Sequence, residues 1–124
     1  MTCNMQVTNR RRSPCPVANA LDIVGDKWSL LVVRDLLRGK LTYTDLLGSP
    51  EHIPTNLLAE RLTRLERAGL ITRSPYQRRP VRYAYTLTDK GRALGAVLKA
   101  YVEWGKRYIP GTMTLGEIHN STLL

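Results

Sequence analysis

The chain has 124 residues, enough for one domain with a hydrophobic core but hardly enough for two. Its formal net charge of +9 and pI near 10.1 favour an anionic partner, nucleic acid before a membrane surface. No apolar run approaches the roughly 20 residues that span a bilayer, and the basic start lacks the apolar segment of a signal peptide. A cytoplasmic protein without membrane contact is therefore expected. Two cysteines, Cys3 and Cys15, are too few for a disulfide framework.

The first quarter of the chain predicts a basic arm followed by a short helix. Residues 1–14 are polar, hold three consecutive arginines and end in Ser-Pro, which is typical of a flexible arm. A helix should then run over 16–25, because a proline suits its first turn and Cys15 falls at its N-cap position. The apolar residues that share one face of this helix are Val17, Leu21 and Val24.

Two further helices are predicted before residue 50. Residues 26–39 carry apolar side chains over most of the helical wheel, which indicates a buried central helix that ends at its glycine. Residues 42–47 begin with Thr42, and Asp45 stands three positions on, a spacing typical of a capping box. Gly-Ser-Pro at 48–50 should end this short helix.

The segment 54–68 predicts a bounded amphipathic helix. Pro54 suits the first turn, and Gly69 stands where a glycine commonly ends a helix. Leu58, Leu62 and Leu65 recur at i, i+4 and i+7 and should face the core. The opposite face carries polar and charged residues, namely Asn56, Glu60, Thr63, Arg64 and Arg67.

After this helix the period changes to two. Residues 81–87 alternate apolar and polar side chains, which predicts a half-buried strand, and 70–76 is its weaker partner. Pro75 restricts that partner to a sheet edge or a strand end. Residues 77–80 are left to form the turn. Helix and hairpin together carry seven arginines against two glutamates, and the arginines are Arg61, Arg64, Arg67, Arg73, Arg78, Arg79 and Arg82.

From Asp89 onward the pattern predicts one helix of about 19 residues, near 28 Å long. Its apolar stripe consists of Leu94, Val97, Leu98, Tyr101, Trp104 and Tyr108. So long an apolar stripe exceeds what a small body needs to cover itself, which suggests a partner subunit. Residues 109–124 show no period and are predicted to be a loose tail.

Taken together, these segments resemble the HxlR-type transcriptional regulators, dimeric winged-helix proteins related in shape to MarR proteins. The resemblance covers about residues 15–107 and rests on six stretches that occur in the right order. The stretches are 15–39 (CPVANALDIVGDKWSLLVVRDLLRG), 43–46 (YTDL), 58–71, 80–87, 87–91 (LTDKG) and 104–105 (WG). The family usually has Phe and Glu where this chain has Tyr43 and Asp45, which are conservative departures.

The resemblance implies a mainly helical fold with a small β-hairpin, a winged helix-turn-helix over 15–108. It also implies a homodimer built through the first and last helices, with two recognition helices in successive major grooves. The residues expected at the dimer interface are Val17, Leu21, Leu94, Val97, Leu98, Tyr101 and Trp104.

Fold and charge together predict contact with double-stranded DNA. Such helices read base edges with their N-terminal end, where Asn can bond adenine, Arg guanine and Glu cytosine. The residues expected to reach bases are Thr55, Asn56, Glu60, Thr63 and Arg64. The residues expected to contact phosphate or the minor groove are Arg67, Arg73, Arg78 and Arg79. The alternative to DNA contact is a charged helix face that is merely solvated and is partly neutralised by Glu60 and Glu66.

Cys15 is the one residue with possible redox chemistry. The helix dipole, free N-H groups and the upstream arginines would stabilise its thiolate, and some proteins of the resembled family sense oxidants with a cysteine here. The alternative is a small N-cap residue without chemistry. We therefore expect a sequence-specific transcriptional regulator, a repressor before an activator, that could respond to oxidants. A non-specific architectural or RNA-binding winged helix is the alternative function.

Other function classes find little support. No motif of a hydrolase, nucleotide-binding enzyme or metalloprotease occurs, and the two cysteines and two histidines lack the pairing of zinc ligands. We therefore predict no enzyme activity, no metal and no cofactor, and leave a small-molecule effector open. Five aromatic residues could line a small-molecule pocket at the dimer interface, but aromatics at such spacings more often form core. We interpret them as core, and they are Trp28, Tyr83, Tyr85, Tyr101 and Trp104.

Overall fold

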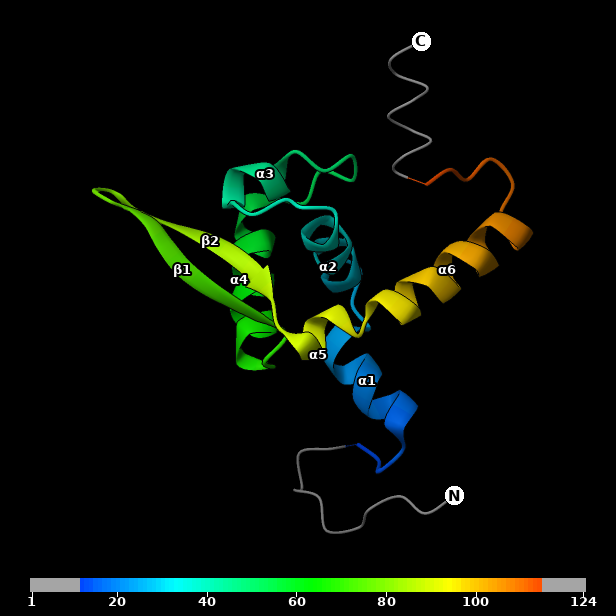
Figure 1. Cartoon of the computed structure of the whole chain (residues 1–124). Helices are drawn as coiled ribbons and strands as arrows, with labels where there is room; N and C mark the ends of the chain where they lie inside the picture. Colours follow the sequence, from blue (N-terminus) through cyan, green and yellow to red (C-terminus); the bar gives the residue numbers. More distant parts are fainter. Residues whose placement is uncertain (1–11, 115–124) are drawn as a thin grey trace.

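The computed structural model describes residues 12–114 and arranges them as six helices and one β-hairpin. Helix α2 lies at the centre, the hairpin extends to one side, and α6 extends to the other (Figure 1). The elements are α1 (Pro16–Val24), α2 (Ser29–Leu37), α3 (Tyr43–Leu47), α4 (Thr55–Arg67), β1 (Ile71–Arg78), β2 (Val81–Leu87), α5 (Asp89–Arg92) and α6 (Gly95–Tyr108). Helices α3 and α4 form the helix-turn-helix, and the hairpin that follows α4 is its wing.

The core forms where α2 and α4 meet the base of the hairpin. The predicted stripe of α4 is confirmed, because Leu58, Leu62 and Leu65 are all buried. They join buried apolar side chains of α2 and of the strands. Gly69, predicted to end α4, adopts a φ of 77°, a left-handed conformation that favours glycine.

Helix α2 begins three residues later than predicted, at Ser29 instead of Asp26. The Asp26 carboxylate accepts hydrogen bonds from the backbone N-H groups of Trp28 and Ser29, both at 3.0 Å, and so fixes a non-helical turn ahead of the helix. The helix is also less buried than predicted, since Leu37 is 38% exposed and Leu30 is half-buried. One face of α2 therefore remains accessible.

The predicted capping box at the start of α3 is confirmed. The Thr42 hydroxyl accepts a hydrogen bond from the Asp45 backbone N-H at 3.1 Å, and the Asp45 carboxylate accepts one from the Thr42 N-H at 3.2 Å. Both bonds satisfy N-H groups that a helix start leaves unpaired. They also hold the pKa of Asp45 below its usual range, with the Thr42 hydrogen bonds as the main cause.

The strand β2 follows the prediction, but the turn of the hairpin is shorter than expected. Gln77 and Arg78 were predicted in the turn, whereas β1 continues through Arg78 and pairs with Val81, leaving two residues between the strands. A bulge after Pro75 lets the ladder resume beyond the residue that cannot donate. The wing is therefore long, and Arg78 lies within β1 and not in the turn.

The predicted single helix after Asp89 is wrong, because α5 and α6 are separate. The Thr88 hydroxyl caps α5 through the Gly91 N-H and donates to the Gly69 carbonyl, which ties α5 to the end of α4. Gly91 packs so closely on Leu70 that a Cβ at this position would collide with the Leu70 carbonyl oxygen. Since this contact fixes α5, α6 leaves in its own direction, away from the hairpin.

The ends of the chain lie largely outside the described residues. Of the predicted arm 1–14 only 12–14 are described, and Arg12 there forms a 2.7 Å ion pair with Asp22 of α1. Of the predicted tail only 109–114 are described. No helix within 12–114 is long and apolar enough to cross a bilayer.

Candidate nucleic-acid interface

The start of α4 is exposed and firmly held. Thr55, Asn56 and Thr63 are all exposed on this helix. The Tyr43 hydroxyl of α3 donates a hydrogen bond to the Thr55 carbonyl at 2.7 Å and thereby joins the two helices of the motif. Thr55 and Asn56 therefore stand on a fixed helix with their side chains exposed, whereas the exposed Thr63 donates its hydroxyl to the Ala59 carbonyl at 3.1 Å.

Ion pairs occupy part of the charged face of α4. Glu60 forms ion pairs with both Arg61 and Arg64, the second at 3.8 Å. A Glu60 that is engaged in this way is less available to accept from a cytosine. Arg67, in contrast, is exposed and forms no ion pair within the described part of the chain.

Arg61 does not belong to the exposed positive surface, although the sequence placed it among the seven arginines there. Its guanidinium donates to the Asp26 carboxylate at 2.7 Å, and its side chain is only 15% exposed. Burial by itself would raise the pKa of Asp26, but hydrogen bonds from Ser29 and Arg61 outweigh it and hold the pKa well below its usual range. The pair therefore braces α4 against the turn that precedes α2.

The wing supplies the exposed positive charge. Arg78, Arg79 and Arg82 are exposed around the turn, and none of them forms an ion pair among residues 12–114. Arg73, lower on the hairpin, lies 3.5 Å from Glu66 and stacks 4.4 Å from the centre of the Tyr83 ring. Arg82 is a candidate contact that was left out of the predicted set, although its place beside the turn was a usable signal.

Helix α4 and the wing lie on the same side of the molecule, away from α1 and α6 (Figure 1). A family model described as HxlR-like helix-turn-helix matches residues 23–113, which is most of the chain. The chain belongs to the HxlR-like helix-turn-helix family. The identification makes it a helix-turn-helix transcriptional regulator and not an enzyme, as predicted.

Individual relatives of this HxlR-like chain agree with the family match. An HTH-type transcriptional regulator of Methanothermobacter thermautotrophicus is 38% identical over 94 residues, which cover 76% of this chain and 72% of the relative. The structure of the transcription factor PA1607 has a TM-score of 0.75 at 35% identity and covers 87% of this chain and 76% of its own. The reduced form of the regulator YodB from Bacillus subtilis has a TM-score of 0.65 at 30% identity, and the match covers 80% of this chain and 98% of the YodB chain. A diamide-treated form of YodB matches as well.

The departures of this chain from the usual HxlR pattern have structural roles. The hydroxyl group that distinguishes Tyr43 from Phe makes the hydrogen bond to the first residue of α4. The shorter carboxylate of Asp45 still completes the capping box of α3. Both departures leave the fold unchanged, as the sequence predicted.

Cys15 lies at the N-cap of α1 in this HxlR-like chain and is half-exposed. Hydrogen bonding from the backbone N-H groups of Ala18 and Val17 lowers the pKa of its thiol. Both N-H groups belong to the free first turn of the helix, as the sequence suggested. The arginines expected upstream lie mostly outside the described residues, and Arg12 points its guanidinium at Asp22.

Apolar side chains are exposed on α1 and α6. Val17 and Leu21 are 66% and 49% exposed, and α6 has no buried residue. The interpretation of Tyr101 and Trp104 as core is therefore wrong, since they are 57% and 59% exposed. The other three aromatics, Trp28, Tyr83 and Tyr85, are partly buried. Leu94 and Leu98 pack partly against the core, whereas Val97 is exposed.

Proposed function

We propose that this protein binds a specific double-stranded DNA operator as a homodimer and represses transcription by occupying it. The observation that carries the proposal is the exposure of Arg78 and Arg79 at the tip of the wing, where neither forms an ion pair within residues 12–114. The wing flanks α4, whose polar face is exposed. In a helix-turn-helix regulator, such a wing can hold a phosphate backbone while the helix lies in the major groove. The described residues form a single DNA-binding fold, so occlusion of a promoter is the simplest mode of action.

Base reading is assigned to the exposed residues of α4. Asn56 can donate to and accept from adenine, and Thr55 and Thr63 can bond either partner of a base pair. Arg64 remains a candidate for guanine, since its 3.8 Å contact with Glu60 is long and exposed. Glu60 is assigned to selectivity in one of two ways. It either orients Arg61 and Arg64 through their ion pairs or accepts a hydrogen bond from cytosine. Arg67, Arg73, Arg78 and Arg79 are assigned to phosphate or the minor groove.

Two substitutions separate positioning from reading. Arg79→Ala should weaken binding to all operator variants alike, because a phosphate contact carries no sequence information. Asn56→Ala should change the ranking of the variants, by about 1–3 kcal/mol at the base pair that it contacts. Gel-shift titration on a panel of single-base variants measures both effects.

Lys99→Ala is the control, because Lys99 is exposed on α6, on the side of the molecule away from the wing. It should leave both affinity and ranking unchanged. An unaltered ranking with Asn56→Ala would remove that residue from the reading set. If the wild-type protein binds all duplexes or RNA equally well, the chain is a non-specific winged helix instead.

The homodimer is proposed from the exposed apolar surface of α1 and α6. Five large apolar side chains are exposed on these two helices, and such a surface is typical of a site of protein–protein contact; they are Val17 and Leu21 on α1 with Val97, Tyr101 and Trp104 on α6. A twofold dimer through these helices would bury this area and present two copies of α4 to one duplex. Leu94 and Leu98 would complete the interface from the inner side of α6.

We further propose that oxidation of Cys15 changes DNA affinity. The half-exposed Cys15 thiol with its lowered pKa supports the idea, as does the treatment of YodB with diamide, a thiol oxidant. Because α1 belongs to the proposed dimer interface, a modification at its start could alter the spacing of the two α4 helices.

Diamide should therefore shift the affinity of the wild-type protein for its operator by at least about fivefold, the lower end of typical coupling between sites. Cys15→Ser should remove this shift and keep the affinity of the reduced protein, since serine preserves the N-cap geometry. Fluorescence anisotropy with labelled operator, before and after diamide, measures both. If Cys15→Ser protein responds to diamide as strongly as the wild type, Cys15 is not the sensor.

A further inference from the structure

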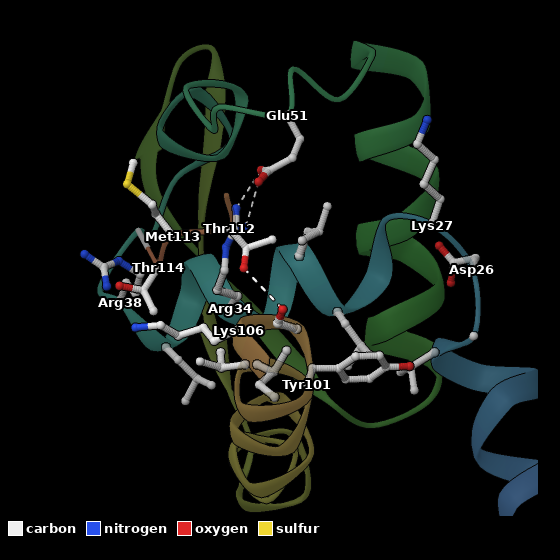
Figure 2. Close-up of a pocket in the computed structure, with 18 residues that line it drawn as sticks. Asp26, Lys27, Arg34, Arg38, Glu51, Tyr101, Lys106, Thr112, Met113 and Thr114 are labelled. Atoms are coloured by element: carbon white, nitrogen blue, oxygen red, sulfur yellow. Dashed lines mark hydrogen bonds and ion pairs between the residues drawn. The ribbon is translucent and has the colours of Figure 1, made fainter. Parts of the chain in front are cut away.

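An apolar pocket of about 680 Å³ is lined by residues of α2 and α6. Figure 2 shows its walls, which come from the turn before α2, from α2, from α6 and from the segment after α6. The floor is lined by Leu30, Leu31, Leu98 and Val102. The volume falls within the range of about 300–1,000 Å³ that is usual for small-molecule sites.

Cationic side chains dominate one part of the pocket wall. Arg34 of α2 and Arg38, the C-cap residue of that helix, stand four residues apart and both line the pocket. Lys106 lines it from α6. Arg38 is exposed and forms no ion pair with any residue of the described chain. The acidic groups of the wall are already engaged, Asp26 with Arg61 and Glu51 with Arg34. A bound anion would therefore meet the charge of Arg38, which no acidic group of the described wall offsets.

The pocket and the proposed dimer surface use largely different faces of α6, and they share only Leu98 and Tyr101 among the α6 residues assigned to the interface. Leu98, Val102 and Gly105 recur at i, i+4 and i+7 and line the pocket. Val97 and Trp104, also seven residues apart, lie about a quarter turn away and do not line it. Tyr101 stands between the two faces, and Leu98 would touch the second subunit only at the edge of the interface. A second subunit packed on the outer face would therefore leave most of the pocket open.

We propose that this pocket binds an amphipathic organic carboxylate and that its occupancy weakens DNA binding. The apolar body of the ligand would lie on the leucines of α2 and α6. Its carboxylate would face Arg34 and Arg38, whose planar guanidinium groups match a carboxylate geometrically. The regulatory part of this inference rests on the proposed function, whereas the binding part stands by itself.

Arg34 connects the pocket with the reading helix. Its guanidinium donates to both Glu51 oxygens, at 2.7 and 2.8 Å, and to the Asp35 carboxylate at 3.0 Å. Glu51 lies in the loop between α3 and α4, four residues before Thr55. Asp35 is buried and accepts a hydrogen bond from Ser49 of the same loop. A carboxylate that competes for Arg34 would release Glu51 and loosen the loop that orients α4.

The binding part is tested with the full-length protein and without DNA. Isothermal titration calorimetry with 2-naphthoate and octanoate should give saturable binding of at least one of them. The neutral 2-naphthamide, or octanamide for octanoate, should bind at least tenfold more weakly, because it lacks the charge that the arginines recognise. No saturable binding of either carboxylate, or equal binding of acid and amide, would overturn the proposal.

Two matched substitutions locate the site. Gly105→Leu places a side chain in the pocket, where an added Cβ meets no atom within 4 Å, and should weaken carboxylate binding at least tenfold. Ala96→Leu puts the same side chain on the opposite side of α6 and should have no effect. Arg38→Glu should abolish carboxylate binding. Lys99→Glu makes the same change of charge on α6 and should leave carboxylate binding unchanged. If Gly105→Leu and Arg38→Glu bind as the wild type does, the ligand lies elsewhere.

The coupling part is tested through Glu51. Saturating carboxylate should weaken operator binding at least fivefold, and Glu51→Gln should weaken it similarly without ligand and then show no further response. A Glu51→Gln protein that still responds to the ligand would overturn the coupling. A protein that binds carboxylate but no DNA contradicts the proposed function alone, whereas one that binds DNA but no carboxylate contradicts only this inference.

Discussion

Raising the salt concentration from about 50 to about 200 mM is expected to weaken operator binding by roughly 10³- to 10⁵-fold if the dimer contacts about 6 to 10 phosphates. Each neutralised phosphate releases condensed counterions, and this release is less favourable at high salt. Arg67, Arg78, Arg79 and Arg82 are exposed and form no ion pair within residues 12–114, so two subunits offer contacts on this scale.

Equilibrium titrations at four or five salt concentrations give the slope of log affinity against log salt. The double variant Arg78→Ala, Arg79→Ala should flatten this slope, since up to four phosphate contacts disappear from a dimer. Lys99→Ala, distant from the wing, should keep the wild-type slope. A wild-type slope near zero would show that the wing arginines do not hold the backbone, whatever their exposure.

Leu58→Ala should lower the free energy of unfolding by about 2–5 kcal/mol, a large part of what a domain of this size has. Leu58 is 0% exposed, and it lies in the core with Leu62 and Leu65. Because its neighbours come from several elements, the cavity can close only partly. Urea unfolding followed by circular dichroism measures the change at a fixed protein concentration, since a dimer is stabilised by its own concentration.

Leu41→Ala is the matched control for this substitution. Leu41 is 45% exposed, so the same truncation removes much less buried area than at Leu58 and should change the free energy by less than about 1 kcal/mol. Similar losses for both variants would contradict the assignment of α4 as a core helix. A selective loss for Leu58→Ala would support the register on which all the exposed α4 residues depend.

The features that followed from the sequence are those with a short-range cause. The stripe of Leu58, Leu62 and Leu65 set the register of α4, and period-two alternation located β2. The capping box of Thr42 and Asp45 spans four residues and could be read directly. These local rules placed the helix-turn-helix and its wing correctly.

The features that did not follow depend on contacts between distant residues. Arg61 was assigned to the positive surface because nothing local indicates its pairing with Asp26, 35 positions earlier. The break between α5 and α6 follows a helical turn whose Gly91 packs closely on Leu70, and no helical period reveals that contact. The extension of β1 through Arg78 required a bulge that the sequence did not specify. The pocket between α2 and α6 is likewise a product of tertiary packing.

Hydroxyl-radical footprinting of the purified protein on the DNA next to its own gene tests the central claim most directly. Two protected patches are expected, with centres about 34–36 Å apart on one face of the duplex, because the two α4 helices of a dimer would enter successive major grooves. The wing variant Arg78→Ala, Arg79→Ala should lose the outer protection first. A single patch, continuous protection without spacing, or no protection at low salt would contradict the account.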